Sequence, residues 1–283
     1  MPELPEVETI RRQLAPVVTG RRIVGGEAHE SPKFAVAPQA AGATVVDVRR
    51  RGKYLIFGLD AGTELVVHLG MTGSLALDAT VDPYVRARWH LDDGTTLRYR
   101  DVRRFGRIAL VPCGVYDALP TLATQGPDPF DDDFTPDDLW RALRRSRARI
   151  KTQLLSQRPV AGVGNIYADE ALWRAGIDPA RRSITRAEAE RLHSAIRDVL
   201  VQGIANGGTT LRDYRTFDGG EGSNQHALDC YGRHGEPCNR CGAVLVRRVL
   251  DGRGTTHCPQ CQPRRGSSFA SRRSAGASRP QRA

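Results

Sequence analysis

The most reactive group that the sequence offers lies in its first six residues, Met1-Pro2-Glu3-Leu4-Pro5-Glu6. A small second residue normally allows removal of the initiator methionine, which would leave Pro2 with a free secondary amine. An α-amino group has a pKa near ~8, against ~10.4 for a lysine side chain, so a sizeable fraction is nucleophilic at neutral pH. Attack on an aldehyde-like sugar carbon would give an iminium, which is an electron sink. Glu3 is the adjacent candidate general acid.

The same residues also have a purely structural interpretation. Pro5 is suited to the first position of a helix, and Glu6 and Glu8 suit the positive end of the helix dipole. These residues alone do not decide between a catalytic terminus and an ordinary helix start.

Four cysteines near the other end have the spacing of a metal site. Cys238 and Cys241 form one C-x2-C pair, and Cys258 and Cys261 form a second pair sixteen residues later. Four thiolates can hold Zn²⁺ tetrahedrally at ~2.3 Å and leave no open position, so this zinc is expected to be structural. Disulfides are the alternative, and they require an oxidising compartment. Two further thiols, Cys113 and Cys230, lack such spacing and are interpreted as buried or incidental.

The segment between the cysteine pairs predicts a hairpin with an arginine at its tip. Val244, Val246 and Val249 precede the turn Asp251-Gly252, and Arg253 follows it. An arginine in this place could reach a phosphate backbone, although a turn arginine is also a common solvated surface charge.

A glycine pair in Gly162-Val163-Gly164-Asn165 precedes a predicted helix. Backbone N–H groups and the helix dipole there suit a phosphate, and an ordinary tight turn would use the same residues. Arg147, Arg149 and Lys151 lie just upstream and would add positive charge, or would form a solvated helix face.

Two further short segments could fill a hole in a base stack. Arg103-Arg104-Phe105-Gly106 combines a flat cation with an aromatic ring, and Met71 stands in Gly70-Met71-Thr72-Gly73. An enzyme that removes a nucleotide from the stack needs such side chains to fill the space. Phe105 could equally belong to a core.

The elements that must position these residues can be read from the periodicity. Val7, Ile10 and Leu14 indicate an N-terminal helix that ends near Pro16, and short β-type runs occupy residues 21–111. A Pro- and Asp-rich linker at residues 125–133 precedes helices that start near Thr135 and Thr185. The sequence therefore predicts an α+β protein with an N-terminal antiparallel sandwich or barrel and a helical second half.

Composition indicates a polyanionic partner. The chain has 283 residues, 40% hydrophobic and 26% charged, with a formal net charge of +10. Six arginines and no acids lie in residues 263–283, which we expect to be a disordered basic tail. The remaining basic residues must gather on one face to bind nucleic acid. No run suits a membrane span or a secretion leader, so we expect a cytoplasmic protein, associated with the nucleoid through DNA.

Together these segments resemble one family, the bacterial formamidopyrimidine-DNA glycosylases, with the endonuclease VIII-type enzymes as a sister group. The resemblance runs from Pro2 to about Gln262 and rests on several motifs in one order. They are P-E-L-P-E-V-E-T at the start, R-G-K-Y-L at 51–55, H-L-G-M-T-G-S-L at 68–75, R-R-F-G at 103–106, G-V-G-N-I-Y-A at 162–168, G-G-T-T-L at 207–211, Y-G-R at 231–233 and the four cysteines.

The resemblance implies a catalytic β-sandwich domain, a helix-two-turn-helix domain and a zinc hairpin held by the four cysteines, with DNA in the cleft between them. On this basis the expected units are the sandwich at residues 1–124, the linker at 125–133, the helical domain at 134–234, the zinc hairpin at 235–262 and the tail at 263–283.

The resemblance also assigns roles. Pro2 is expected to be the nucleophile, Glu3 the acid that opens the sugar, Lys53 a phosphate contact that assists β-elimination, and Arg253 a phosphate ligand for δ-elimination. The residues expected to fill the void are Met71, Arg103 and Phe105. Further expected contacts to the DNA backbone are Arg147, Lys151 and Asn165.

Two departures from the family pattern affect the DNA-binding residues. Val102 stands where the family usually has proline in D-P-R-R-F, and Tyr84 stands where it has a DNA-contacting histidine. A tyrosine hydroxyl can still donate one hydrogen bond, so Tyr84 is retained as an expected DNA contact.

The expected activity is excision of oxidised purines, 8-oxoguanine and formamidopyrimidines, from double-stranded DNA by a monomeric glycosylase that also cleaves the strand. The first alternative is a non-catalytic, zinc-dependent DNA-binding protein in which Pro2 only starts a helix. The second is the sister group's preference for oxidised pyrimidines.

Overall fold

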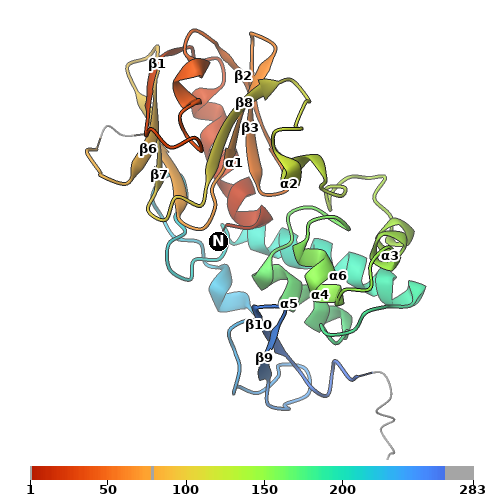
Figure 1. Cartoon of the computed structure of the whole chain (residues 1–283). Coiled ribbons are helices and arrows are strands. Elements are labelled where there is room, and N and C mark those ends of the chain that lie inside the picture. Colours follow the sequence, from red (N-terminus) through yellow and green to blue (C-terminus); the bar gives the residue numbers. More distant parts are fainter. Residues whose placement is uncertain (1, 78–79, 265–283) are drawn as a thin grey trace, which may run out of the picture.

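The computed structural model describes residues 2–77 and 80–264, and it has two halves with a hairpin below them (Figure 1). A β-sandwich forms the upper half of that view, helices form the lower half, and the N-terminus lies where they meet. The predicted α+β class is confirmed. The predicted disorder of the tail concerns residues 265–283, which lie outside the described residues.

Helix α1 (Leu4–Val18) joins the two halves. Pro5 is its second residue, and the Glu6 side chain accepts a hydrogen bond from the backbone N–H of the N-cap residue Glu3 at 2.7 Å, at capping-box spacing. Its apolar stripe, which includes Val7 and Ile10, packs into the sandwich core, whereas Leu4 packs into the helical core. The helix ends at Val18, close to where Pro16 and Gly20 were expected to end it, and it tolerates Pro16 because proline in the last turn displaces only one helix hydrogen bond.

The sandwich consists of two four-stranded antiparallel sheets. One has the order β1 (Ile23–Ala28), β6 (Val85–Leu91), β7 (Thr96–Asp101), β5 (Gly73–Leu77). The other has the order β2 (Val45–Arg51), β3 (Tyr54–Leu59), β4 (Thr63–His68), β8 (Arg107–Pro112). Trp89 is fully buried between them and donates its indole N–H to the carbonyl of Ala37, 2.9 Å away, in the 3-10 turn Ala37–Ala40 (η1).

The short helix α2 (Pro120–Ala123) belongs to the upper half, where Leu122 is buried in one cluster with Tyr54 and Ile56 of β3. The lower half holds α3 (Pro136–Arg144), α4 (Ile150–Leu155), α5 (Asn165–Ala175) and α6 (Arg186–Ala205), followed by the 3-10 turn Asn224–Ala227 (η2). Thr135 and Thr185 cap α3 and α6, as the sequence predicted, through capping boxes. Helices α5 and α6 pack together over a core that includes Leu172, Leu192 and Ile196.

The hairpin consists of β9 (Val246–Leu250) and β10 (Arg253–His257), which pair antiparallel. Asp251 and Gly252 form its turn with φ of 48° and 77°. Positive φ at both turn residues matches the right-handed twist of a two-residue hairpin. Among the described residues, we find no helix with the length and apolarity needed to span a bilayer.

Candidate active site

The centre of the site is the Glu3 carboxylate, which is 2% exposed. It accepts hydrogen bonds from the backbone N–H groups of Gly164 (2.7 Å), Ile166 (2.9 Å) and Tyr167 (3.3 Å), at the start of α5. A Cβ on Gly164 would lie 2.2 Å from the Glu3 carboxyl carbon, so glycine is needed for this close approach. Of the glycine pair that suited a phosphate, Gly164 therefore binds the carboxylate next to Pro2, which is itself buried, whereas the N–H of Gly162 donates to Gln157.

A second carboxylate, Glu6, lies directly beside the first. It accepts hydrogen bonds from the backbone N–H groups of Glu3 and Thr209, both at 2.7 Å, and from the Tyr167 hydroxyl at 2.8 Å. Burial, together with the negative charge of Glu3, raises the pKa of Glu6 to about 7. The site therefore places two buried carboxyl groups close to Pro2, and Tyr167 donates to both of them, through its backbone N–H to Glu3 and through its hydroxyl to Glu6.

Lys53 reaches this site from the turn between β2 and β3. It is 7% exposed, and its pKa is lowered, chiefly by burial, with the charge of Arg253 acting in the same direction and those of Glu3 and Glu6 opposing it. Beside it Arg50 donates to Glu8 of α1 (3.1 Å) and to Asp128 of the linker (2.6 Å), which fixes the turn. The structure thus brings Lys53 close to Glu3 and Arg253, three residues far apart in the sequence.

The hairpin that carries Arg253 is attached to the helical half next to this residue. The carbonyl of Gly254 accepts hydrogen bonds from Lys151 Nζ (2.9 Å) and from Asn165 Nδ2 (3.2 Å). Lys151 also donates to the Thr255 hydroxyl at 2.9 Å. Arg253 itself is exposed and follows the turn, as predicted.

Lys151 is buried, contrary to what a phosphate contact requires. It is 1% exposed, and its Nζ lies 2.7 Å from Asp169 Oδ1 in an ion pair. Since its donors point to Asp169 and to the hairpin, a direct phosphate contact would need another conformation from the one seen here. Asn165 also faces the hairpin, and its Oδ1 is buried without a hydrogen-bond partner among the described residues.

The three residues expected to fill the void lie on two loops in direct backbone contact. A Cβ on Gly70 would lie 2.4 Å from the backbone nitrogen of Gly106, so the loops could not approach this closely with any other residue at position 70. Arg103 stacks on the Phe105 ring, with 4.8 Å between the guanidinium carbon and the ring centroid. Met71 is 37% and Phe105 50% exposed, so Phe105 is not a core residue.

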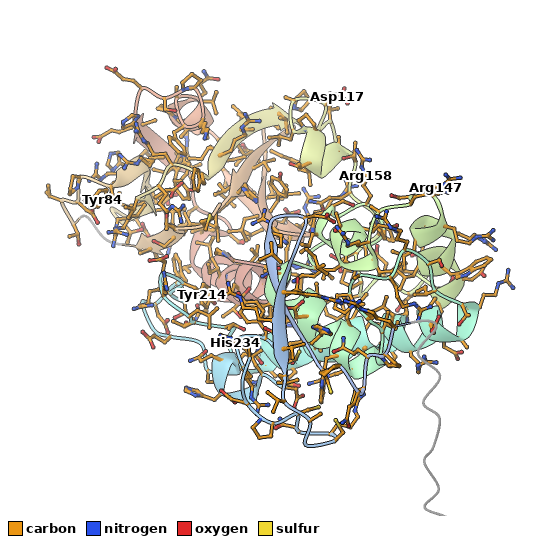
Figure 2. All side chains as sticks on the ribbon, turned by 60° about the horizontal axis from the view of Figure 1, so that its bottom comes forward. Tyr84, Asp117, Arg147, Arg158, Tyr214 and His234 are labelled. Atoms are coloured by element: carbon orange, nitrogen blue, oxygen red, sulfur yellow. The ribbon has the colours of Figure 1, made fainter. Side chains whose placement is uncertain are left out.

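The remaining predicted DNA contacts lie at the two edges of the molecule (Figure 2). Tyr84 precedes β6 in the sandwich, is 42% exposed, and has the guanidinium of Arg100 over its ring at 5.2 Å. Arg147 lies in the loop between α3 and α4, and its side chain is exposed. The structure does not bring either residue to the Glu3 carboxylate.

The four predicted zinc ligands form one cluster, with all sulfur atoms within 4.8 Å of one another. Tetrahedral zinc with ~2.3 Å bonds needs sulfur atoms ~3.8 Å apart. Here Cys238 and Cys261 are 4.0 Å apart, and Cys241 and Cys258 are 3.4 Å apart, so the residues fit one structural Zn²⁺. Trp173 donates its indole N–H to the Cys238 sulfur at 3.3 Å. Cys230 is buried beside the cluster and donates to the Thr256 carbonyl instead.

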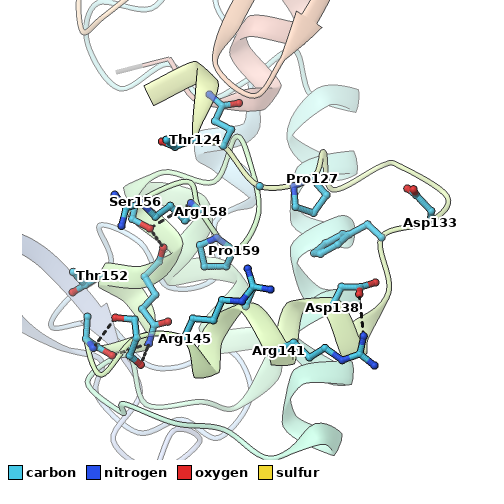
Figure 3. A pocket seen from close by; sticks show the side chains of 17 residues that line it. Thr124, Pro127, Asp133, Asp138, Arg141, Arg145, Thr152, Ser156, Arg158 and Pro159 are labelled. Atoms are coloured by element: carbon cyan, nitrogen blue, oxygen red, sulfur yellow. Dashed lines mark hydrogen bonds and ion pairs between the residues drawn. The ribbon is translucent and has the colours of Figure 1, made fainter. Parts of the chain in front are cut away.

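A cavity of about 1010 Å³ lies elsewhere (Figure 3). It is lined by the linker, α3 and α4, with Phe134, Arg145 and Arg158 among its residues. None of the predicted catalytic residues lines it, so its size does not indicate the reaction centre.

Two residues at the site were not predicted as functional: Glu6 and Asp169. In the sequence, Glu6 and Asp169 look like ordinary helix acids, since nothing local shows that they are buried. The one available signal was the i, i+3 spacing of Glu3 and Glu6, which is that of a capping box.

Comparison with known families accounts for most of the chain. Residues 1–108 match the formamidopyrimidine-DNA glycosylase N-terminal domain, and residues 125–215 match the H2TH domain of the same enzymes. Residues 235–264 match a zinc finger found in FPG and IleRS.

Individual relatives extend the similarity over nearly the whole chain. A formamidopyrimidine-DNA glycosylase of Thermus thermophilus is 47% identical over 266 residues, which cover 93% of this chain and 98% of the relative. The enzyme of Deinococcus radiodurans is 44% identical and covers 94% of this chain and 98% of its own.

Solved structures show the same similarity at the level of the fold. The crystal structure of MutM (Fpg) from Thermus thermophilus has a TM-score of 0.87 at 46% identity, covering 92% of this chain and 98% of that one. The complex of Lactococcus lactis Fpg with DNA containing an abasic site has a TM-score of 0.83 at 36% identity, covering 93% and 100%. With the carboxylate, lysine and zinc hairpin arranged as above, the chain belongs to the formamidopyrimidine-DNA glycosylase family.

Proposed function

We propose that this DNA glycosylase and abasic-site lyase excises oxidised purines from duplex DNA with Pro2 as nucleophile and Glu3 as acid. The observation that carries the proposal is the Glu3 carboxylate, buried next to Pro2 and fixed by three backbone N–H groups from the start of α5. A carboxyl group with this degree of fixation is poised to act on one atom of a bound sugar.

In the first step the Pro2 nitrogen attacks C1′ of the damaged nucleotide, the bond between C1′ and the base breaks, and the proton that the nitrogen loses goes to the departing base. Glu3 delivers a proton to the ring oxygen O4′, so the sugar opens. The nitrogen lone pair then forms an iminium with C1′. Because proline nitrogen is a secondary amine, this species keeps its positive charge without binding a further proton.

Strand cleavage follows from the same intermediate. The iminium acidifies the C2′ hydrogen, and loss of that proton expels the 3′ phosphate. A second elimination expels the 5′ phosphate and leaves phosphate at both sides of the gap. Lys53 lies near Glu3 and has a lowered pKa, which suits proton transfer during elimination.

The zinc hairpin serves binding. Zinc has no open position among four cysteines, so it supplies folding free energy to the hairpin rather than chemistry. The hairpin presents Arg253 toward Lys53, where its guanidinium would hold the phosphates that leave in the eliminations.

We infer that the partner is double-stranded DNA with a damaged base. The exposed Met71, Arg103 and Phe105 would occupy the space of the extruded nucleotide. Arg147 and Tyr84 would contact the DNA backbone farther out. The protein would act as a monomer in the cytoplasm, held at the nucleoid by DNA.

Borohydride trapping on a duplex with one 8-oxoguanine tests the proposal. The enzyme gives a covalent adduct whose peptide map places the DNA on Pro2, whereas a non-catalytic DNA-binding protein gives none. Protein with Met1 retained, or with an acetylated terminus, should bind an abasic-site analogue normally and fail to trap. Trapping at the normal rate with Met1 in place would identify a lysine such as Lys53 as the nucleophile instead.

The same assay separates the lesion classes. Parallel duplexes with 8-oxoguanine and with an oxidised pyrimidine, compared by single-turnover excision, should show faster excision of the purine. Faster excision of the pyrimidine would favour the sister group's preference.

A further inference from the structure

The turn residue Asp251 connects the tip of the zinc hairpin to helix α4. One carboxylate oxygen accepts a hydrogen bond from the Arg149 guanidinium, and the other accepts one from the Thr152 hydroxyl. Arg149 is the N-cap of α4 and Thr152 lies in its first turn, about a hundred residues earlier in the chain. Thr152 lies at the edge of the view in Figure 3, beside the hairpin.

The contacts of Asp251 fix the turn of the hairpin, which its other contacts with the protein do not hold. The cysteine cluster fixes its base, and Lys151 and Asn165 hold the carbonyl of Gly254. Asp251 lies on the opposite side of Arg253 from Gly254. The backbone of Arg253 is therefore held on both sides, two residues before it and one residue after it.

The conformation of the turn makes this contact directional. Asp251 has a φ of 48°, a left-handed conformation that aspartate tolerates better than most residues. With the backbone restricted in this way, binding both carboxylate oxygens to α4 sets how the turn is oriented against the helix. This orientation then sets the direction in which the Arg253 side chain points from the start of β10.

We propose that Asp251 is a positioning residue for Arg253, and that its contacts with Arg149 and Thr152 tune the second elimination. This inference rests on the proposed role of Arg253 at the phosphates. The ion pair is half-exposed, with Arg149 at 33% and Asp251 at 40%, so it adds little to global stability. Its effect is on the position of the Arg253 side chain at the hairpin tip.

The test uses the full-length, zinc-loaded protein and a duplex with a preformed abasic site, at saturating protein and in a single turnover. Products of one and of two eliminations are resolved on a gel. Asp251→Ala should slow the second elimination about tenfold, as expected for a slightly misplaced charged group, and should leave the first elimination unchanged. Asp251→Asn keeps the preference for a left-handed turn and one hydrogen-bond acceptor, so it should fall between wild type and Asp251→Ala.

A double-mutant comparison shows whether the effect runs through α4. Arg149→Ala should slow the second elimination as well, and adding it to Asp251→Ala should have almost no further effect. Glu236→Ala is the matched control, since Glu236 is another exposed acid of the same zinc module and pairs with Arg233 at 2.8 Å. Zinc content and melting temperature are measured for every variant.

The outcomes separate this inference from the proposed function. If Arg253→Ala leaves the ratio of the two products unchanged, the proposed role of Arg253 is wrong and the inference falls with it. If Arg253→Ala suppresses the second elimination while Asp251→Ala behaves as wild type, only the inference is wrong. Fully additive effects of Asp251→Ala and Arg149→Ala, or an equal effect of Glu236→Ala, would also overturn it.

Discussion

The catalytic centre and the hairpin tip are both places where distant parts of the chain meet, and they are built in opposite ways. At the centre, the buried carboxylates of Glu3 and Glu6 accept hydrogen bonds from backbone N–H groups of three separate segments. At the tip, Asp251 contacts the side chains of Arg149 and Thr152 in a partly exposed setting.

The two regions differ in whether a substitution leaves hydrogen-bonding partners unsatisfied. A buried carboxylate that is removed leaves backbone donors without partners, which costs about 1–3 kcal/mol for each donor. A removed exposed side chain leaves partners that water can satisfy. The centre therefore has one permitted geometry, whereas the tip can be adjusted at low cost in stability.

The largest effect is expected for Glu3→Gln in the buried region. We expect single-turnover excision of 8-oxoguanine to fall roughly 10³-fold, because general acid catalysis typically contributes about 10²–10⁴-fold. Cleavage at a preformed abasic site should be spared, because that sugar already opens to an aldehyde. An equal loss on both substrates would show that Glu3 has only a structural role.

Cys258→Ser tests the other region, the zinc hairpin. Losing one of four ligands should release zinc, unfold the hairpin with Arg253, and weaken binding to an abasic-site analogue roughly 10²-fold. Zinc content and melting temperature should fall together. A variant with full zinc stoichiometry would refute the assignment of Cys258 as a ligand.

Glu6→Gln tests the buried region through the pH dependence of folding stability. The folded-state pKa of about 7 lies above the unfolded value of 4.5, so the stability that Glu6 contributes is fully present below 4.5 and is lost as pH rises through 7. The loss is on the order of 3 kcal/mol. Chemical denaturation at pH 5.5 and 8.5 should show about 2 kcal/mol of this loss in wild type, since part of it already occurs below pH 5.5, and a smaller loss in Glu6→Gln. Parallel curves for the two proteins would exclude Glu6 as the titrating group.

The smallest expected effect comes from residues 263–283, which carry six arginines and no acids. Truncation after Gln262 should reduce the slope of log affinity against log salt by roughly 0.9 for each DNA phosphate that the tail arginines neutralise. Single-turnover excision at saturating protein should not change. An unchanged slope would mean that the tail does not bind DNA.

Local chemistry was enough to predict the parts of the molecule that one short segment determines. The cysteine spacing predicted the zinc site, the Asp251-Gly252 turn predicted the hairpin, and the capping residues Thr135 and Thr185 predicted two helix starts. Residues 21–111 were predicted only as a set of short β-type runs, because the glycines and short lengths of strands such as β1 (Ile23–Ala28) and β5 (Gly73–Leu77) weaken the alternating pattern that would give their bounds.

Burial was the main property that the sequence did not reveal. Lys151 reads as a solvated cation next to Arg149, yet it is paired with Asp169 inside the protein. The glycines around Val163 resemble a phosphate loop, yet the anion that the N–H of Gly164 binds is the protein's own Glu3. In both cases the decisive partner lies in another segment of the chain, so no local pattern records it.

The sharing of helix α1 between the two cores has a consequence for how the enzyme is made. The N-terminal residues leave the ribosome first, but Leu4 packs into the helical core and the partner of Glu6 is Thr209. A nascent or truncated chain that stops before Thr209 therefore lacks one hydrogen-bond donor to the buried Glu6 carboxylate, and one that stops before Gly164 lacks every backbone donor to Glu3. We therefore expect the site to be complete only late in synthesis.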